Sequence, residues 1–97
     1  MSYPTLIDYD NYNIDIGYNM FLIDCTSTNI NIYLPQMLYD GISFFIKRID
    51  NSTNTLSLHV NSTDNVPIDD STSTLSIQPY EYIELFSYNS KWWITDK

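Results

Sequence analysis

The chain has 97 residues, a formal net charge of −8 and a single cysteine. This length fits one domain, and one cysteine excludes an intrachain disulfide framework. Twelve acidic residues against four basic ones would repel phosphate, so we expect no nucleic-acid partner. We also expect no membrane partner, because no apolar run has the length of a transmembrane helix and the N-terminus does not resemble a signal peptide.

Residues 1–18 differ in pattern from the remainder of the chain. Asp8, Asp10 and Asp15 lie among tyrosines, and only Ile14 and Ile16 show the period-two spacing of a strand. This pattern predicts an N-terminal arm with at most one edge strand, which becomes ordered against a partner. The single β domain is then expected to span residues 19–97.

From residue 19 onward, short apolar runs alternate with polar residues and are separated by turn residues. In residues 29–34, for example, Ile30, Ile32 and Leu34 fall on one face, and Pro35 ends the run because it lacks a backbone N–H. Residues 36–40 are expected to form a loop or one helical turn. The predicted strands, in chain order, are 20–24, 29–34, 42–49, 55–60, 74–77, 81–86 and 92–95, with a brief extended piece at 66–68.

The stretch 42–60 carries the clearest pattern. Its two alternating runs flank residues 50–54 (DNSTN), a cluster of side chains that favour turns by bonding their own backbone. The pattern predicts a β-hairpin. About eight short strands at roughly ten-residue spacing predict an all-β fold, a small antiparallel sandwich or barrel-like domain preceded by the short N-terminal arm.

Nothing in the sequence favours catalysis, and we expect no enzyme activity. The only histidine, His59, falls on the polar face of its strand, and Cys25 follows an apolar run that indicates burial. Glu81 and Glu84 fall on opposite faces of a strand, because their spacing is three residues.

Metal and sugar attachment are also disfavoured. Asp64, Asp69 and Asp70 could hold calcium, but they do not form an EF-hand series, so no metal is expected. Two glycosylation sequons begin at Asn51 and Asn61. Chance explains both in a chain so rich in Asn, Ser and Thr.

Aromatic residues are the one group with a binding interpretation. Nine tyrosines and two tryptophans exceed what a small core needs. Three uses remain open, which in order of preference are a protein interface, ordinary strand composition and sugar stacking. In Trp92-Trp93 the two side chains point to opposite faces, so one can lie in the core and the other at a subunit contact.

Lys47 and Arg48 are the only adjacent basic residues. Alternation places them on opposite faces of one strand, so at most one can serve a given interface. In a chain of charge −8 they are better candidates for pairing with acidic residues of this or a neighbouring subunit than for binding phosphate.

Several short motifs follow one another along residues 20–95. They are 34–35 (LP), 41–50 (GISFFIKRID), 54–58 (NTLSL), 68–69 (ID), 80–85 (YEYIEL) and 92–94 (WWI). The series resembles a β-rich domain of phage and large-virus fibre and virion surface proteins, which include head fibres, tail fibre tips and capsid decoration proteins. The family reads LP, G-x-x-F-x-I-K, I-D-G and S-D-G-x-x-W; here the glycines of the last two motifs are replaced.

The resemblance implies a homotrimer on the virion surface, with no catalytic residue and no cofactor. The expected interface residues are Phe45, Tyr80, Tyr82, Trp92 and Trp93. The N-terminal arm is expected to hold a capsid or other virion protein through Tyr3, Leu6, Ile7, Tyr9 and Tyr12.

Because the chain is short and has no shaft, a head fibre or decoration protein fits better than a full tail fibre. Host attachment through a surface glycan is a further expectation. The alternatives are a carbohydrate-binding module that uses exposed Tyr and Trp and, last, a hydrolase fragment.

Overall fold

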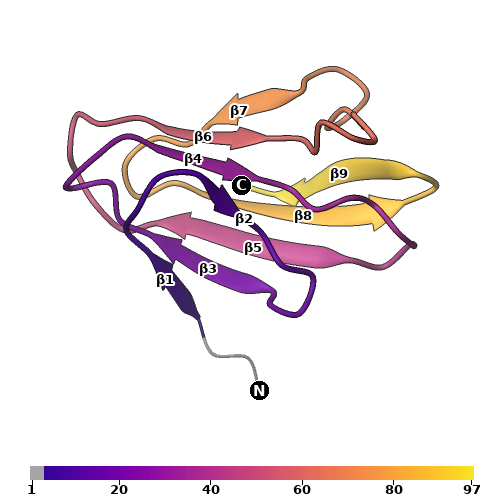
Figure 1. The fold of residues 1–97 in the computed structure, drawn as a ribbon, viewed down its shortest axis with the longest axis horizontal. Helices are drawn as coiled ribbons and strands as arrows, with labels where there is room; N and C mark the ends of the chain where they lie inside the picture. The colour runs from indigo at the N-terminus through magenta and orange to yellow at the C-terminus, as the bar shows by residue number, and fades with distance from the viewer. Residues whose placement is uncertain (1–3) are drawn as a thin grey trace.

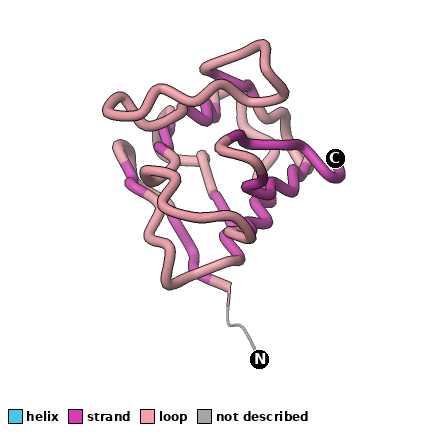
Figure 2. The backbone as a smooth tube through the Cα atoms, turned by 90° about the vertical axis from the view of Figure 1, so that its right-hand side faces the viewer, coloured by secondary structure: helices cyan, strands magenta, loops and turns pink. Residues whose placement is uncertain are grey.

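A computed structural model describes residues 4–97 of the chain. The described residues form nine strands and no helix. The ribbon and tube views show how strands and loops follow one another along the chain (Figures 1 and 2). Within this part of the chain there is accordingly no helix long and apolar enough to cross a membrane. The strands are β1 (Thr5–Ile7), β2 (Tyr12–Asn13), β3 (Met20–Ile23), β4 (Ile30–Tyr33), β5 (Ser43–Arg48), β6 (Leu56–His59), β7 (Thr74–Ser76), β8 (Tyr82–Tyr88) and β9 (Lys91–Asp96).

The strands form two sheets, and both are mixed. The five-stranded sheet has the order β1-β3-β5-β8-β9, and the four-stranded sheet has the order β2-β4-β6-β7. Pairs among β1, β3 and β5, and among β2, β4 and β6, are parallel, whereas the later pairs are antiparallel. The all-β prediction is therefore confirmed, but the sheets are not purely antiparallel.

In the parallel part of the fold, the chain winds three times around the core; we call this part the coil and each winding a turn of the coil. The chain passes from one sheet to the other after β1, β3 and β5, so each turn contributes one strand to each sheet (Figure 1). The second and third turns repeat at almost constant spacing, since Met20 pairs with Phe45 and Ile30 pairs with Leu56. Apolar residues that alternate in each strand then stack in rows between the sheets.

Side chains in the crossing loops connect successive turns of the coil. An Asp10 carboxylate oxygen accepts a hydrogen bond from the Asn31 N–H (2.7 Å), and the Asn29 side-chain oxygen accepts one from the Thr55 N–H (2.9 Å). The Asp10 contact also lowers the pKa of that carboxyl below its ordinary value of 3.8. These side chains therefore satisfy backbone N–H groups of the next turn, one within β4 at Asn31 and one just before β6 at Thr55.

The predicted hairpin at 42–60 is wrong. β5 lies in the five-stranded sheet and β6 in the four-stranded sheet, and residues 49–55 cross between the sheets. The backbones of the two strands pair instead with strands one turn away, β3 and β4. Alternation identified both strands correctly, but it carries no information on which partner each strand bonds.

The expected N-terminal arm is not confirmed. β1 and β2 form the first turn of the coil, and Ile7 and Ile14 are buried in the core. Tyr12 packs against Phe21 of the next turn, with ring centroids 5.9 Å apart. Residues 4–18 are thus part of the sandwich.

The C-terminal part closes the coil with antiparallel strands. β7 pairs with β6, and the β8–β9 hairpin pairs with β5. A two-residue turn joins β8 to β9, and its residues Asn89 and Ser90 both have positive φ (55° and 61°). Two such residues match the twist of a two-residue hairpin, and they adopt it here without glycine.

The core lies between the two sheets and combines aliphatic residues with a few aromatic ones. Phe44 packs against Phe21 and Trp92, with ring centroids 6.1 Å and 5.7 Å apart. The core also includes Ile7, Ile14, Ile23, Cys25, Ile30, Ile32, Leu34, Ile42, Ile46, Leu56, Leu58, Val60, Ile68, Ile77, Ile83 and Leu85.

Candidate functional site

The outer face of the five-stranded sheet is apolar and aromatic. In register across the strands, one row contains Leu22 and Tyr82, a second contains Met20 and Phe45, and a third contains Phe86. We call this surface the aromatic face; its apolar residues are Met20, Leu22, Phe45, Tyr82, Phe86, Tyr88 and Trp93, with Leu6 at its margin. An apolar surface that extends over several strands is typical of a contact with another molecule.

The outer face of the four-stranded sheet has the opposite character. Its rows contain small polar residues, and its only aromatic rings are Tyr33 and His59, which stack on each other with centroids 4.9 Å apart. The outward residues are Asn13, Asn31, Tyr33, Ser57, His59, Thr74 and Ser76. The fold therefore has one polar outer face and one apolar outer face, and only the apolar face would lose unfavourable contact with water if another molecule covered it.

The rings of the aromatic face are held in place by contacts within it. Phe45 stacks on Tyr82, with ring centroids 5.3 Å apart and planes 23° apart. The Trp93 indole N–H donates to the Tyr88 carbonyl oxygen at 3.0 Å. Side chains ordered in advance lose less entropy when a partner binds, so this surface is suited to association.

The aromatic face is close to neutral, although the chain has a net charge of −8. Two basic residues, Lys47 and Lys91, and two acidic residues, Glu84 and Asp96, lie on it, and Lys91 forms its ion pair with Asp70. Asp96 also raises the pKa of the Tyr82 phenol, through a hydrogen bond and through its charge. Because Arg48 is buried, these two lysines and Lys97 are the basic side chains available at the surface.

The structure separates the five predicted interface residues. Phe45, Tyr82 and Trp93 lie together on the aromatic face. Tyr80 lies in the turn that precedes β8 and has a positive φ of 63°, and the Lys47 ammonium donates to its carbonyl oxygen. Trp92 is fully buried in the core, so its side chain is not exposed to a partner.

The predicted anchor residues also divide. Leu6 and Tyr9 are exposed, Tyr12 is half-buried and Ile7 is in the core. Tyr3 lies outside the described residues. The sequence did not indicate that Met20, Leu22 and Phe86 share one face with Phe45, because alternation gives the side of each residue within its own strand but not which strands are neighbours.

A groove with a cavity volume of about 520 Å³ opens where β7 ends beside β8 and β9. Leu75, Ile77, Ile83 and Ile94 contribute apolar lining, while Tyr80, Glu81 and Lys97 contribute polar groups. A groove that has an apolar lining and a few polar groups can accept a ring-shaped ligand.

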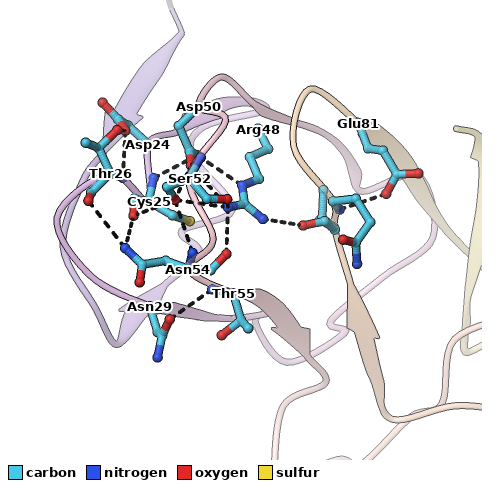
Figure 3. Close-up of polar contacts among 12 residues, drawn as sticks. Asp24, Cys25, Thr26, Asn29, Arg48, Asp50, Ser52, Asn54, Thr55 and Glu81 are labelled. Carbon is cyan, nitrogen blue, oxygen red and sulfur yellow. Dashed lines mark hydrogen bonds and ion pairs between the residues drawn. The ribbon is translucent and has the colours of Figure 1, made fainter.

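A buried polar cluster surrounds the loop that crosses from β5 to β6 (Figure 3). Arg48 and Asp50 form an ion pair, with Nε 3.0 Å from Oδ1, and their side chains are 2% and 3% exposed. The Asp50 carboxylate also accepts hydrogen bonds from the backbone N–H groups of Cys25 and Ser52. The cluster joins two crossing loops, because Cys25 belongs to the turn of the coil before Asp50.

All three nitrogens of the Arg48 guanidinium donate hydrogen bonds within the protein. Besides Asp50, it donates to the carbonyl oxygens of Ile77 (3.0 Å), Asn54 (2.7 Å) and Ser52 (3.3 Å). The prediction that Lys47 and Arg48 point to opposite faces is confirmed, and Arg48 pairs within its own subunit. The sequence did not indicate that Asp50 is buried with it.

This environment sets the protonation of both Asp50 and Cys25. The hydrogen bond from Arg48 holds the pKa of the Asp50 carboxyl far below its ordinary value of 3.8, and backbone N–H donors add to the effect. Burial raises the pKa of the Cys25 thiol to about 11, which keeps it protonated at neutral pH. A protonated, buried thiol is a poor nucleophile, as expected for a core residue.

The low pKa of Asp50 predicts a loss of stability in acid. A carboxyl with a depressed folded-state pKa stabilises the fold above its unfolded pKa, and this contribution disappears as pH falls through the folded-state value. We expect the free energy of unfolding to fall from about pH 4 downward, measured by urea denaturation at successive pH values. The Asp50→Asn variant should show a shallower fall; an unchanged slope would assign the acid sensitivity to other carboxyls.

The other candidate residues serve structural contacts. His59 lies between Asn31 (2.8 Å) and Thr74 (3.2 Å) on the outer polar face. Asp69 accepts a hydrogen bond from the Ile94 N–H, and Asp70 pairs with Lys91 at 3.0 Å. In the part of the chain that the structure describes, no three metal-ligating side chains come together.

No family model matches the chain, and no curated protein is similar to it.

Proposed function

We propose that this protein is a structural protein of a virion, without catalytic activity, that forms a homotrimer through the aromatic face. The proposal covers a phage head fibre, a capsid decoration protein or a fibre tip, displayed at the virion surface. The observation that carries the self-association is the contrast between the aromatic face and the polar outer face of the opposite sheet. The virion assignment is supported by the ordered motifs along residues 20–95.

Charge favours a second copy of the chain as the partner at the aromatic face. Two copies, each with a net charge of −8, repel each other over most of their surface. The repulsion is smallest at the aromatic face, where two of the surface lysines, Lys47 and Lys91, lie on the same face as Glu84 and Asp96. Apolar contact there can bring like-charged copies together, and a polar, acidic surface is left for display.

The test compares single charges placed on the two outer faces. We expect light scattering to give a mass about three times 11.4 kDa for the wild-type chain at micromolar concentration. Phe86→Glu places a charge in the middle of the aromatic face and should give the monomer mass. Burying that charge without a partner would cost more than the contact contributes.

Ser76→Glu is the matched control, since it adds the same charge to the outer face of β7. It should leave the trimer intact, and circular dichroism should show both variants folded. A monomeric wild-type chain, or a Phe86→Glu trimer, would refute the proposed assembly. Locating the protein in a purified particle tests the virion assignment separately.

The groove beside Tyr80 favours carbohydrate binding as a second candidate function. The exposed Tyr80 ring offers a stacking surface, and Glu81 and Lys97 offer hydrogen-bonding groups at the same groove. A glycan array would separate the two functions. The carbohydrate-binding module would be favoured if the wild-type chain has a monomeric mass and binds a glycan that the Tyr80→Ala variant does not bind.

A further inference from the structure

The two ends of the coil differ in how their edge strands are protected. At the C-terminal end, the Thr72 hydroxyl bonds both the N–H and the carbonyl oxygen of Thr74 on the free side of β7. On β9, Asp69 accepts from the Ile94 N–H and donates its own N–H to the Trp92 carbonyl (both 2.9 Å). Such contacts prevent another strand from pairing with an edge.

The N-terminal edge strand β1 has no comparable protection among the described residues. The Ile7 carbonyl accepts from the Asp24 N–H, so Ile7 faces β3. Since neighbouring residues of a strand direct their backbone groups to opposite sides, the N–H and carbonyl of Leu6 point outward. No other described residue bonds them, and Figure 1 shows β1 at the margin of its sheet.

Exposed apolar and aromatic side chains lie on this edge strand and just after it. Leu6 is 56% exposed, and Tyr9, two residues beyond the end of β1, is 53% exposed. Tyr9 packs edge-on against Tyr12, with ring centroids 5.9 Å apart. A strand added to β1 would therefore gain backbone hydrogen bonds and cover apolar surface together.

Charge identifies the kind of strand that would fit. Asp8, Asp10 and Asp15 lie in the two loops next to β1 and β2, and the first basic residue of the chain is Lys47. Lys47 lies in the same cross-strand row as Leu6, but it is two strands away from β1, on β5. A second copy would bring the same acidic end against this one, so a copy is disfavoured and a basic segment is favoured.

We propose that β1 binds an extended basic segment of a partner protein, which pairs with the outward backbone of Leu6 as an additional strand. The inference rests on the proposed virion role, since this contact would hold the protein to its particle. It uses the backbone edge of the sheet, whereas the trimer contact uses the outer face and meets this edge only at Leu6, so the two contacts can form in one assembly.

The probe is a short synthetic peptide of alternating lysine and valine residues, titrated into the full-length protein. We expect one peptide to bind per chain, with slower hydrogen exchange of the Leu6 amide measured by NMR. Leu6→Pro removes the outward N–H without changing charge and should weaken binding at least about tenfold, the equivalent of one charge-assisted or buried hydrogen bond. An alternating glutamate and valine peptide should not bind.

Two controls separate strand addition from general attraction to an acidic protein. Leu6→Thr keeps the backbone N–H and should weaken binding less than Leu6→Pro does. Ser76→Pro alters the outward side of β7 and should bind the peptide as the wild type does. The proposal is overturned if the peptide fails to bind, if Leu6→Pro binds equally well, or if only Ser76→Pro weakens binding.

The experiment also distinguishes this inference from the trimer proposal. If Leu6→Pro does not fold, the exchange rate of the Leu6 amide in the wild-type protein decides, and an unchanged rate overturns strand addition. Phe86→Glu should bind the peptide like the wild type, whatever its mass. Light scattering alone reports whether the trimer forms, and the peptide titration alone reports whether a strand is added to β1.

Discussion

Replacing Arg48 with methionine is expected to lower the free energy of unfolding by about 3–5 kcal/mol. The substitution keeps most of the side-chain volume but leaves the Asp50 carboxylate buried without its counter-charge. It also leaves the carbonyl oxygens of Ile77 and Asn54 without the donors that they now have. In a domain of this size the melting temperature should fall by roughly 15–30 °C, measured by circular dichroism.

Lys47→Met is the matched control, because it removes the same charge from the adjacent residue of β5. Lys47 points to the outer face, so its loss should change stability by less than about 1 kcal/mol. Adding Asp50→Asn to Arg48→Met should recover part of the loss, since the unpaired charge is then gone. Equal effects of Arg48→Met and Lys47→Met would show that the buried pair contributes little.

Positions of strands were predictable from this sequence, but the sheet to which each strand belongs was not. The alternation in residues 29–34 and 55–60 is a local property, and the structure has β4 and β6 there. The partners of β4 and β6 are each about one coil turn away, so no local pattern records them. The turn-forming residues 50–54 favoured a hairpin, yet Asn54 donates to the Cys25 carbonyl of the preceding turn.

One sequence signal could have indicated the coil. The pair of runs at 20–23 and 30–33 recurs at 45–48 and 56–59, in the register that the structure shows. A search for repeats of about 25 residues would have found two similar apolar patterns, and parallel stacking is typical of such repeats. The first turn is shorter, with Thr5 paired to Phe21, so this repeat breaks down where the arm was predicted.

The candidate site was also only partly predictable, because a local pattern does not show which strands are neighbours. Alternation correctly separated Lys47 from Arg48 and set Tyr82 opposite Ile83, and Phe45, Tyr82 and Trp93 all lie on the outer side of their strands. It could not reveal that they share one face, since that depends on β5, β8 and β9 being neighbours in one sheet. It also could not show which tryptophan is buried, because both faces of β9 carry one.

Removing residues 1–18 is expected to unfold the protein, whereas the sequence pattern predicted an arm separate from the β domain. The truncation deletes the first turn of the coil, including the buried Ile7 and Ile14. Each fully buried aliphatic side chain contributes about 1.5–3 kcal/mol, and Phe21 would lose the Tyr12 ring packed against it. The sum is comparable with the whole stability of a small domain, about 5–15 kcal/mol.

Circular dichroism and a thermal melt of the truncated chain provide the measurement. The matched control is Leu6→Ser with Tyr9→Ser, which changes exposed side chains of the same segment and should keep a cooperative melt. A truncated chain that melts cooperatively near the wild-type temperature would restore the arm interpretation. If it unfolds, loss of particle binding after truncation is no evidence for an anchor, and only a change confined to the edge, such as Leu6→Pro, can test how this end of the coil binds.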